Sequence, residues 1–191
     1  MSAMTHPKTL IRRSVRDRLK TAVETEAGPV YPTPAADRVY AARSAPIPDK
    51  PQPSILVYTD EDKAEGELYQ DTPRRALTLT VCCAACKSSE ETLEDLLDEM
   101  ELAAYLVVMN DPYQGGNAQE TNFIGSNRYR DYKSSPFYGE AKVEFQVIYG
   151  LPDPSAEGLD DFLRFHADYD LAPADGNIDA TDDVSLPGPE T

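Results

Sequence analysis

The spacing of apolar residues predicts an amphipathic helix near the beginning of the chain. Between residues 6 and 24 the apolar positions recur at helical spacing: Ile11, Val15, Leu19, Ala22 and Val23. Pro7 suits the first turn of such a helix, and Gly28-Pro29 lies shortly beyond its end. The first element of the chain is therefore expected to be a helix of several turns.

A second amphipathic helix is expected from Ser88. Ser88 with Glu91 three residues later matches a capping box, and the acids of the first turn suit a helix N-terminus. Its apolar stripe comprises Leu93, Leu96, Leu97, Met100, Ala104, Val107 and Val108. Acids on the opposite side predict a solvated face: Glu94, Asp95, Asp98 and Glu101. The sequence Asn110-Asp111-Pro112 ends this helix, and Gly115-Gly116 then form a turn.

Other segments have the period of two that is typical of strands. Residues 54–58 are apolar as in a buried strand, and residues 74–83 place Leu77, Leu79, Val81 and Cys83 on one side. Residues 140–149 place Val143, Phe145, Val147 and Tyr149 on one face. A further strand around Phe123-Ile124 leads into the polar and aromatic residues 128–133, expected to be a charged strand or hairpin arm.

Two segments read as irregular. Residues 29–53 contain seven of the sixteen prolines, which excludes a helix and favours a proline-edged arm or edge strand. Residues 59–67 are so acidic and polar that a solvated loop is expected. The order of elements therefore predicts an α+β fold, with two helices packed on one face of a mainly antiparallel sheet.

This domain is expected to span residues 1–150, because Pro152 and Pro154 follow the last clear strand. Residues 151–191 then form an acidic C-terminal extension, with a short helix expected over residues 158–169 and extended chain over residues 170–191. The extension holds eleven acids against one base, and the rest of the chain 23 acids against 17 bases. The total of -16 argues against a surface that binds nucleic-acid phosphates or anionic lipids.

The basic side chains of the first helix form the one positive face that the sequence indicates. Arg12, Arg16 and Lys20 lie in one row at intervals of four residues, and Arg13 is placed to pair with Asp17. A contact with an acidic neighbour, including another copy of the chain, and an ordinary solvated helix face explain this row equally well.

The candidate reactive groups predict neither a catalytic nor a metal site. Cys83 and Cys86 have the spacing of half a zinc site, but the sequence has no second cysteine pair, and His6 and His166 lie near opposite ends. The three cysteines, including Cys82, are therefore expected to complete a core strand. No cofactor is predicted. The longest apolar stretch, residues 102–109, is too short to span a bilayer, and synthesis in the cytosol is expected.

The order and spacing of these elements resemble the lambda-like phage tail terminator family, that of the minor tail protein U. The resemblance covers about residues 5–150 and contains no catalytic signature. In the first half of the chain its parts are Thr9-Leu10-Ile11-Arg12, the strand of residues 53–58, and the acidic loop that leads into the strand of residues 76–81. In the second half they are the helix of residues 93–109 with Asn110-Asp111, the segment Arg128-Tyr129-Arg130-Asp131-Tyr132, and the closing strand of residues 141–149. The acidic extension departs from the pattern.

The resemblance implies a non-enzymatic virion protein, assembled in the host cytoplasm, that forms a hexameric ring on the head-proximal end of the tail tube. Such a ring stops tube polymerisation and offers a surface for head-to-tail joining. Implied partners are the tail tube protein, a head-completion or connector protein and, in a contractile tail, the sheath protein. DNA would pass through the ring without specific binding, because acidic side chains repel it.

Interface residues are predicted from the sequence itself. The positive candidates are Arg12, Arg13, Arg16, Arg128 and Arg130, and the acidic candidates for a neighbouring subunit are Asp60, Glu61 and Asp62. Two other functions fit the same sequence. One is another neck or head-tail connector protein, which would not stop tube growth. The other is an acidic DNA-mimic inhibitor, which would be a monomer or dimer without need of the proline-rich arm.

Overall fold

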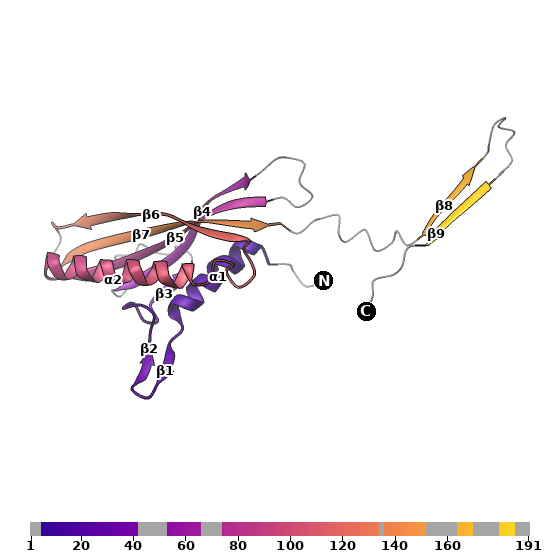
Figure 1. Ribbon diagram of the computed structural model, residues 1–191. Helices are drawn as coiled ribbons and strands as arrows, with labels where there is room; N and C mark the ends of the chain where they lie inside the picture. The colour runs from indigo at the N-terminus through magenta and orange to yellow at the C-terminus, as the bar shows by residue number, and fades with distance from the viewer. Residues whose placement is uncertain are drawn as a thin grey trace. The chain divides into compact units, whose positions relative to one another are not determined.

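The computed structural model describes residues 5–41, 53–65, 74–133, 136–151, 164–169 and 180–185. The chain divides into two compact units, Met1–Leu151 and Pro152–Thr191. In the first unit, helices α1 (Pro7–Lys20) and α2 (Glu90–Met109) cover one face of a five-stranded sheet (Figure 1). This confirms the α+β fold class and the packing of both helices on the same face.

The sheet is antiparallel except at one edge. Its strand order is β3-β4-β5-β7-β6, and only β3 and β4 run parallel. The strands are β3 (Val39–Ala41), β4 (Ser54–Glu65), β5 (Arg74–Lys87), β6 (Glu120–Asp131) and β7 (Phe137–Gly150). The short β3 therefore realises the edge strand expected within the proline-rich segment, of which residues 42–52 lie outside the described part.

The hydrophobic core lies between the helices and the sheet. Alternate residues of the two central strands point into it, as their period of two predicts. These are Leu77, Leu79, Val81 and Cys83 from β5, and Val143, Phe145, Val147 and Tyr149 from β7. The helices contribute Ile11, Val15 and Leu19 from α1, and Leu93, Leu97, Met100, Ala104 and Val108 from α2. Burying each large apolar side chain stabilises the fold by about 1.5–3 kcal/mol.

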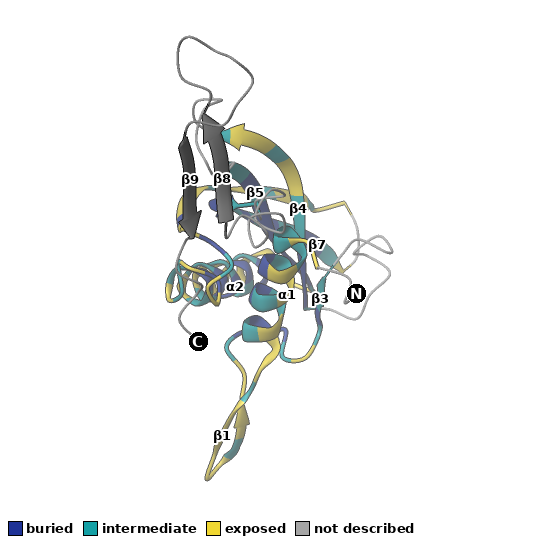
Figure 2. Ribbon diagram, turned by 90° about the vertical axis from the view of Figure 1, so that its right-hand side faces the viewer, coloured by how far each residue is buried: buried dark blue, intermediate teal, exposed yellow. Residues whose placement is uncertain are grey.

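The end of the first helix was predicted too late. Helix α1 ends at Lys20, and Thr21 turns into extended backbone while its N–H and hydroxyl both donate to the Asp17 carbonyl. Strands β1 (Val23–Thr25) and β2 (Gly28–Val30) then form an antiparallel hairpin, helped by Gly28 at φ +109°. Val23, expected in the helix core, is exposed on this hairpin, which projects from the body (Figure 2).

The prediction of an acidic loop over residues 59–67 is also wrong. Strand β4 continues to Glu65 and pairs with β5 down to Arg74, after a register shift between Thr59 and Asp62. The charged residues of this half of β4 have a poor strand propensity, but hydrogen bonds between the backbones of β4 and β5 outweigh it. The strand tolerates these residues because most of their side chains remain exposed to solvent. Residues 66 and 67 lie outside the described part.

The predicted capping box at Ser88 does not form. Pairing of β5 with β7 continues to Lys87, so the chain is still extended there, and Ser89 becomes the residue that precedes α2. Thr92 donates to the Ser89 carbonyl at 3.1 Å. At the other end the prediction is confirmed, since Asn110 follows the last helical residue.

The turn after α2 ties the two helices together. Gly115 and Gly116 have φ values of +69° and +81°, which confirms them as turn residues. Buried Gln114 in the same turn accepts a hydrogen bond from Arg18 of α1, which also donates to the Val107 carbonyl at 3.1 Å. Arg18 thereby places a positive charge at the negative end of α2.

The second unit contains strands where a helix and extended chain were predicted. Strand β8 (Arg164–Tyr169) pairs antiparallel with β9 (Ala180–Ser185). A short apolar pattern does not distinguish helix from strand, and pairing between two segments supplies the backbone hydrogen bonds. The remaining residues of the expected helix, 158–163, and residues 170–179 and 186–191 lie outside the described part.

Candidate interaction surfaces

A β-bulge directs the charged residues of β6 toward α2. The register shifts between Phe123 and Gly125, so that the strand carries one extra residue against β7. Phe123 pairs with Phe145 before the bulge, and Arg128 pairs with Ala141 after it; both partners belong to the helix-facing side. The bulge thus places odd and even positions of β6 on one face.

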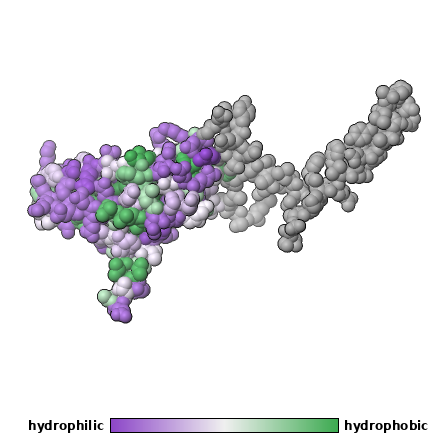
Figure 3. Space-filling model, viewed as in Figure 1, coloured by the Kyte–Doolittle hydropathy of each residue, from purple (hydrophilic) through white to green (hydrophobic). Residues whose placement is uncertain are grey.

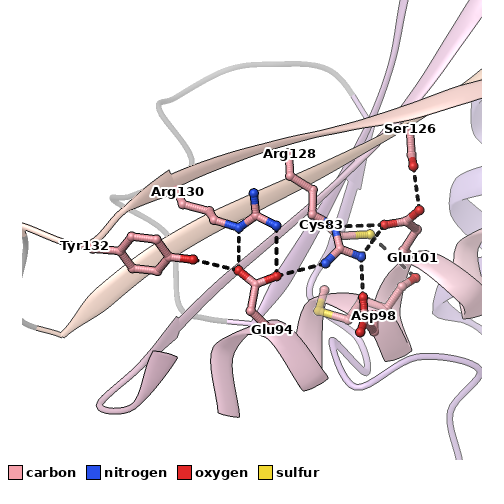
Figure 4. A network of polar contacts seen from close by, with 9 residues as sticks. Cys83, Glu94, Asp98, Glu101, Ser126, Arg128, Arg130 and Tyr132 are labelled. Carbon is pink, nitrogen blue, oxygen red and sulfur yellow. Dashed lines mark hydrogen bonds and ion pairs between the residues drawn. The ribbon is translucent and has the colours of Figure 1, made fainter. Parts of the chain in front are cut away.

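Arg128 is the centre of a charged network between β6 and α2 (Figure 4). Its guanidinium binds Glu94 at 3.0 Å and Glu101 at 2.6 Å, and it also pairs with Asp98. Ser126 donates to Glu101 at 2.6 Å. Partial burial works to lower the pKa of Arg128, but its hydrogen bonds to Glu101 and Asp98 outweigh burial and raise that pKa. We call these four charged residues, with Arg130, the arginine clamp.

Glu94 joins both arginines of the clamp. Arg130 binds it through two guanidinium nitrogens, one of them at 3.0 Å, and the Tyr132 hydroxyl donates to it at 2.8 Å. These contacts, led by the hydrogen bond from Arg130, lower the pKa of Glu94 to about 2. The Glu94 carboxylate therefore remains charged at physiological pH, and its ion pairs with Arg128 and Arg130 hold β6 to α2.

Acid is expected to weaken the clamp in a defined pH range. The lowered pKa of Glu94 contributes stability above the ordinary value of 4.5, and this stability is lost as the pH falls from there toward about 2. Urea unfolding of the wild type and of Glu94→Gln should therefore differ near pH 7, and the difference should shrink toward zero near pH 2. A difference that stays constant over this range contradicts the assigned role of Glu94.

The sequence predicts that Arg128 and Arg130 contact neighbouring subunits. In the structure both arginines form ion pairs with acids of their own chain. The acids expected to form a plain solvated face of α2 include their partners Glu94, Asp98 and Glu101. Strand β6 is an edge strand, and among the described strands it pairs with β7 alone. The clamp therefore anchors the sheet edge rather than offering free positive charge.

The other basic candidates lie on α1. Asp17 pairs with its neighbour Arg16 at 2.6 Å, not with Arg13 as expected. Arg13 and Lys20 are exposed, and Arg12 is partly buried with its Nε atom lacking an acceptor among the described residues. Three positive side chains of this helix are thus without an ion pair in the described part of the chain.

The acidic candidates of β4 have separate roles. Asp62 is mostly buried and accepts hydrogen bonds from Arg75 at 2.8 Å and from Tyr149 at 3.0 Å. Burial works to raise the pKa of Asp62, but these bonds outweigh it and lower that pKa; burial and Asp62 together raise the pKa of Tyr149 to about 12. Glu61 pairs with Lys63, and Asp60 accepts from Thr80 at 3.2 Å.

The cysteines lie in the sheet as the sequence predicts. Cys83 is fully buried, its thiol donates toward the Met100 carbonyl at 3.7 Å, and burial raises its pKa, which keeps the thiol protonated. Cys82 belongs to a second apolar cluster on the helix-free face of the sheet, and Cys86 packs against that cluster. Among the described residues, no group of three or more potential ligands is arranged to hold a metal ion.

The sequence reasoning missed an apolar surface over α2 and β6. Leu102 and Leu106 are 60% and 55% exposed, and Phe123 and Ile124 of β6 are also exposed. A groove of about 300 Å³ between the two elements is lined by Leu102, Tyr105, Phe123, Val143 and clamp residues. Figure 3 shows this area as a green patch. The sequence did contain a signal for this surface, because Leu102 and Leu106 are four residues apart and lie outside the core stripe of the helix.

The β1–β2 hairpin carries a second exposed apolar surface. Val23 and Val30 are direct cross-strand partners and are 65% and 55% exposed. Figure 3 shows a green area on the hairpin. Isolated two-stranded hairpins are marginally stable in water, and exposed apolar pairs are typical of surfaces that meet another molecule. The sequence signal was Gly28, which was interpreted only as the end of a helix.

Comparison of the chain with models of known protein families gives no match, and comparison with curated proteins gives no significant match. Within the described residues, no helix combines the length and the apolar composition needed to cross a membrane.

Proposed function

We propose that the chain is a structural subunit of a phage tail, a terminator that forms a ring on the head-proximal end of the tail tube. The ring would stop tube polymerisation and give the head a surface to join. The observation that carries this proposal is a small α+β unit with apolar side chains exposed on two surfaces, the β1–β2 hairpin and the α2–β6 patch. Such patches on a soluble domain are typical of contact surfaces.

The element order supports the terminator in particular. The chain runs from α1 through an edge-strand region to β4 and β5, then α2, β6 and β7, which is the layout on which the resemblance to tail terminators rests. The projecting hairpin is suited to reach a neighbouring copy or the tube, since its valines have solvent on their outer side. The proposed partners are further copies of the chain in a hexameric ring, the tube protein, a head-side connector and, in a contractile tail, the sheath.

The charge of the chain fits a passage for DNA. A formal net charge of -16 repels phosphate backbones, so DNA could move through a ring of these subunits without being retained. The proposed location is the virion, at the head-proximal end of the tail, after assembly in the host cytoplasm.

A tube-growth assay tests this function. Tube subunits from the phage or prophage that encodes the chain would be polymerised with and without it, and tube lengths measured by electron microscopy. We expect short tubes in its presence. The variant Val23→Lys/Val30→Glu should stay folded, because both side chains are exposed and the two new charges attract across the strands, and should fail to stop growth.

Glu24→Ala is the control, since Glu24 follows Val23 on the same strand and its side chain points to the opposite face of the hairpin. It should stop tube growth like the wild type. Unchanged tube lengths with the wild-type chain contradict the proposed function. Binding to a head-side connector without any effect on tube growth would identify a neck component of another kind.

A further inference from the structure

The two helices present opposite charges on the same side of the sheet. Helix α1 contains six basic residues and one acid, and α2 contains seven acids and no basic residue. The arginine clamp neutralises only the flank of α2 that faces β6. The outer face of α2 therefore keeps its negative charge, and the outer face of α1 its positive charge.

The outer face of α2 has the pattern of a helix-packing seam. Asp95, Glu99, Leu102 and Leu106 follow one another at intervals of four, three and four residues, so they form one exposed stripe. Neither acid of this stripe has an ion pair within the described residues. Acids thus occupy the N-terminal half of the stripe, and exposed leucines the C-terminal half.

The outer face of α1 has a matching pattern in the reverse direction. Leu10, Arg13, Asp17 and Lys20 follow at intervals of three, four and three residues. Leu10 is exposed near the beginning of this stripe, and the exposed bases Arg13 and Lys20 follow it.

We propose that the outer face of α1 in one copy of the chain packs antiparallel against the outer face of α2 in a second copy. The lengths agree: Leu10 to Lys20 spans about 15 Å, and Asp95 to Leu106 about 16 Å, at 1.5 Å per residue. In this register Leu10 meets Leu106, and Lys20 meets Asp95. The exposed leucines are then covered, and the unpaired Asp95 lies beside Lys20.

This contact rests on the proposed function and specifies how the subunits join. Each copy carries one basic and one acidic helix face. In the proposed ring the contact is heterologous, with α1 of each copy against α2 of the next, and closure of the ring satisfies every face. Charge complementarity selects a second copy as the occupant, because the chain itself contains the basic helix that fits the acidic stripe. Asp17 faces Glu99 in this register, where Arg13 and Arg16 offset the repulsion.

Charge reversal tests the contact. One variant is Arg13→Glu/Lys20→Glu, and the other is Asp95→Lys. Sedimentation velocity at low salt over a range of concentrations should show self-association of the wild type and at least about tenfold weaker association of either variant, because each places like charges opposite each other where Lys20 meets Asp95. An equimolar mixture of the two variants should restore association, since each reversed helix finds an opposite one.

Two further proteins make the result specific. The control Lys63→Glu/Lys133→Glu changes the net charge as much as the first variant, at exposed positions outside both helices, and should associate like the wild type. A chain that carries all three helix substitutions should associate again, because its two faces are complementary once more. Thermal unfolding verifies that each protein is folded.

A wild-type chain that stays monomeric at every concentration, either variant associating like the wild type, or a mixture that fails to associate overturns this inference. None of these results decides the proposed function, which the tube-growth assay tests with the wild-type chain alone. Conversely, association restored in the mixture would support the contact, and tubes that grow to full length in the presence of the wild-type chain would reject the terminator role.

Discussion

Replacing Arg128 with glutamate should lower the free energy of unfolding by about 2–3 kcal/mol, the upper part of the range for losing hydrogen bonds to charged groups. The Arg128 side chain is only 21% exposed and binds Glu94, Asp98 and Glu101. The substitution places a fourth carboxylate beside these three. Among the described residues only Glu94 then keeps a positive partner, Arg130, and β6 pairs with no strand other than β7. Urea unfolding followed by circular dichroism measures the loss.

Two controls separate the clamp from a general charge effect. Lys133→Glu makes the same charge change at an exposed position just beyond β6, and should cost less than about 0.5 kcal/mol. Arg128→Lys keeps the charge but loses the planar fork that reaches several acids, so an intermediate cost is expected. If Arg128→Glu unfolds at the same urea concentration as Lys133→Glu, the clamp does not hold the sheet edge.

Replacing Phe145 with alanine should cost about 3–5 kcal/mol, by removing apolar contacts and leaving a cavity. Phe145 is fully buried at the centre of β7, between the sheet and the helices. Its ring lies 5.9 Å from that of Phe123, which in turn lies 5.3 Å from that of Tyr105. This row of rings connects the core to the surface between α2 and β6, so the loss should also loosen the edge strand.

The neighbouring ring provides the comparison. Phe123→Ala removes a side chain of the same size that is nearly half exposed, and should cost less than half as much as Phe145→Ala. Thermal unfolding should show the same order. Equal losses for the two substitutions would contradict the placement of the core between the helices and the helix-facing side of the sheet.

Residues with regular spacing could be predicted from the sequence. Ile11, Val15 and Leu19 identified the buried face of α1, and the alternation around Leu79 and Phe145 identified two central strands. In each case burial of apolar area decides the structure, and this leaves a periodic pattern that is visible locally. The α+β class followed from the order of these elements.

Contacts between distant segments could not be predicted in the same way. Arg128 meets Glu101 across 27 positions of the chain, and no local pattern indicates that partner. The bulge after Phe123 hides the strand period of β6, with Gly125 as the one visible sign. The charged half of β4 reads as a loop because its strand character comes from pairing with β5.

Some of the interface residues predicted from the sequence form contacts within the chain in the structure. Asp62, Arg128 and Arg130 are engaged within the chain. Arg12, Arg13 and Arg16 remain predicted interface residues, and the acidic surface that we assign to Arg13 is the outer face of α2 instead of the ribbon of residues 59–65. The distinction depends on which acids already have partners, and residue types alone do not reveal that.

Imaging of tube ends is the decisive test of the proposed ring. Tail tubes would be incubated with the wild-type chain and examined by cryo-electron microscopy, with averaging of both ends. We expect a closed ring of copies on one end only, with α1 of each copy against α2 of the next. Bare ends, or the chain bound along the tube wall, would contradict it.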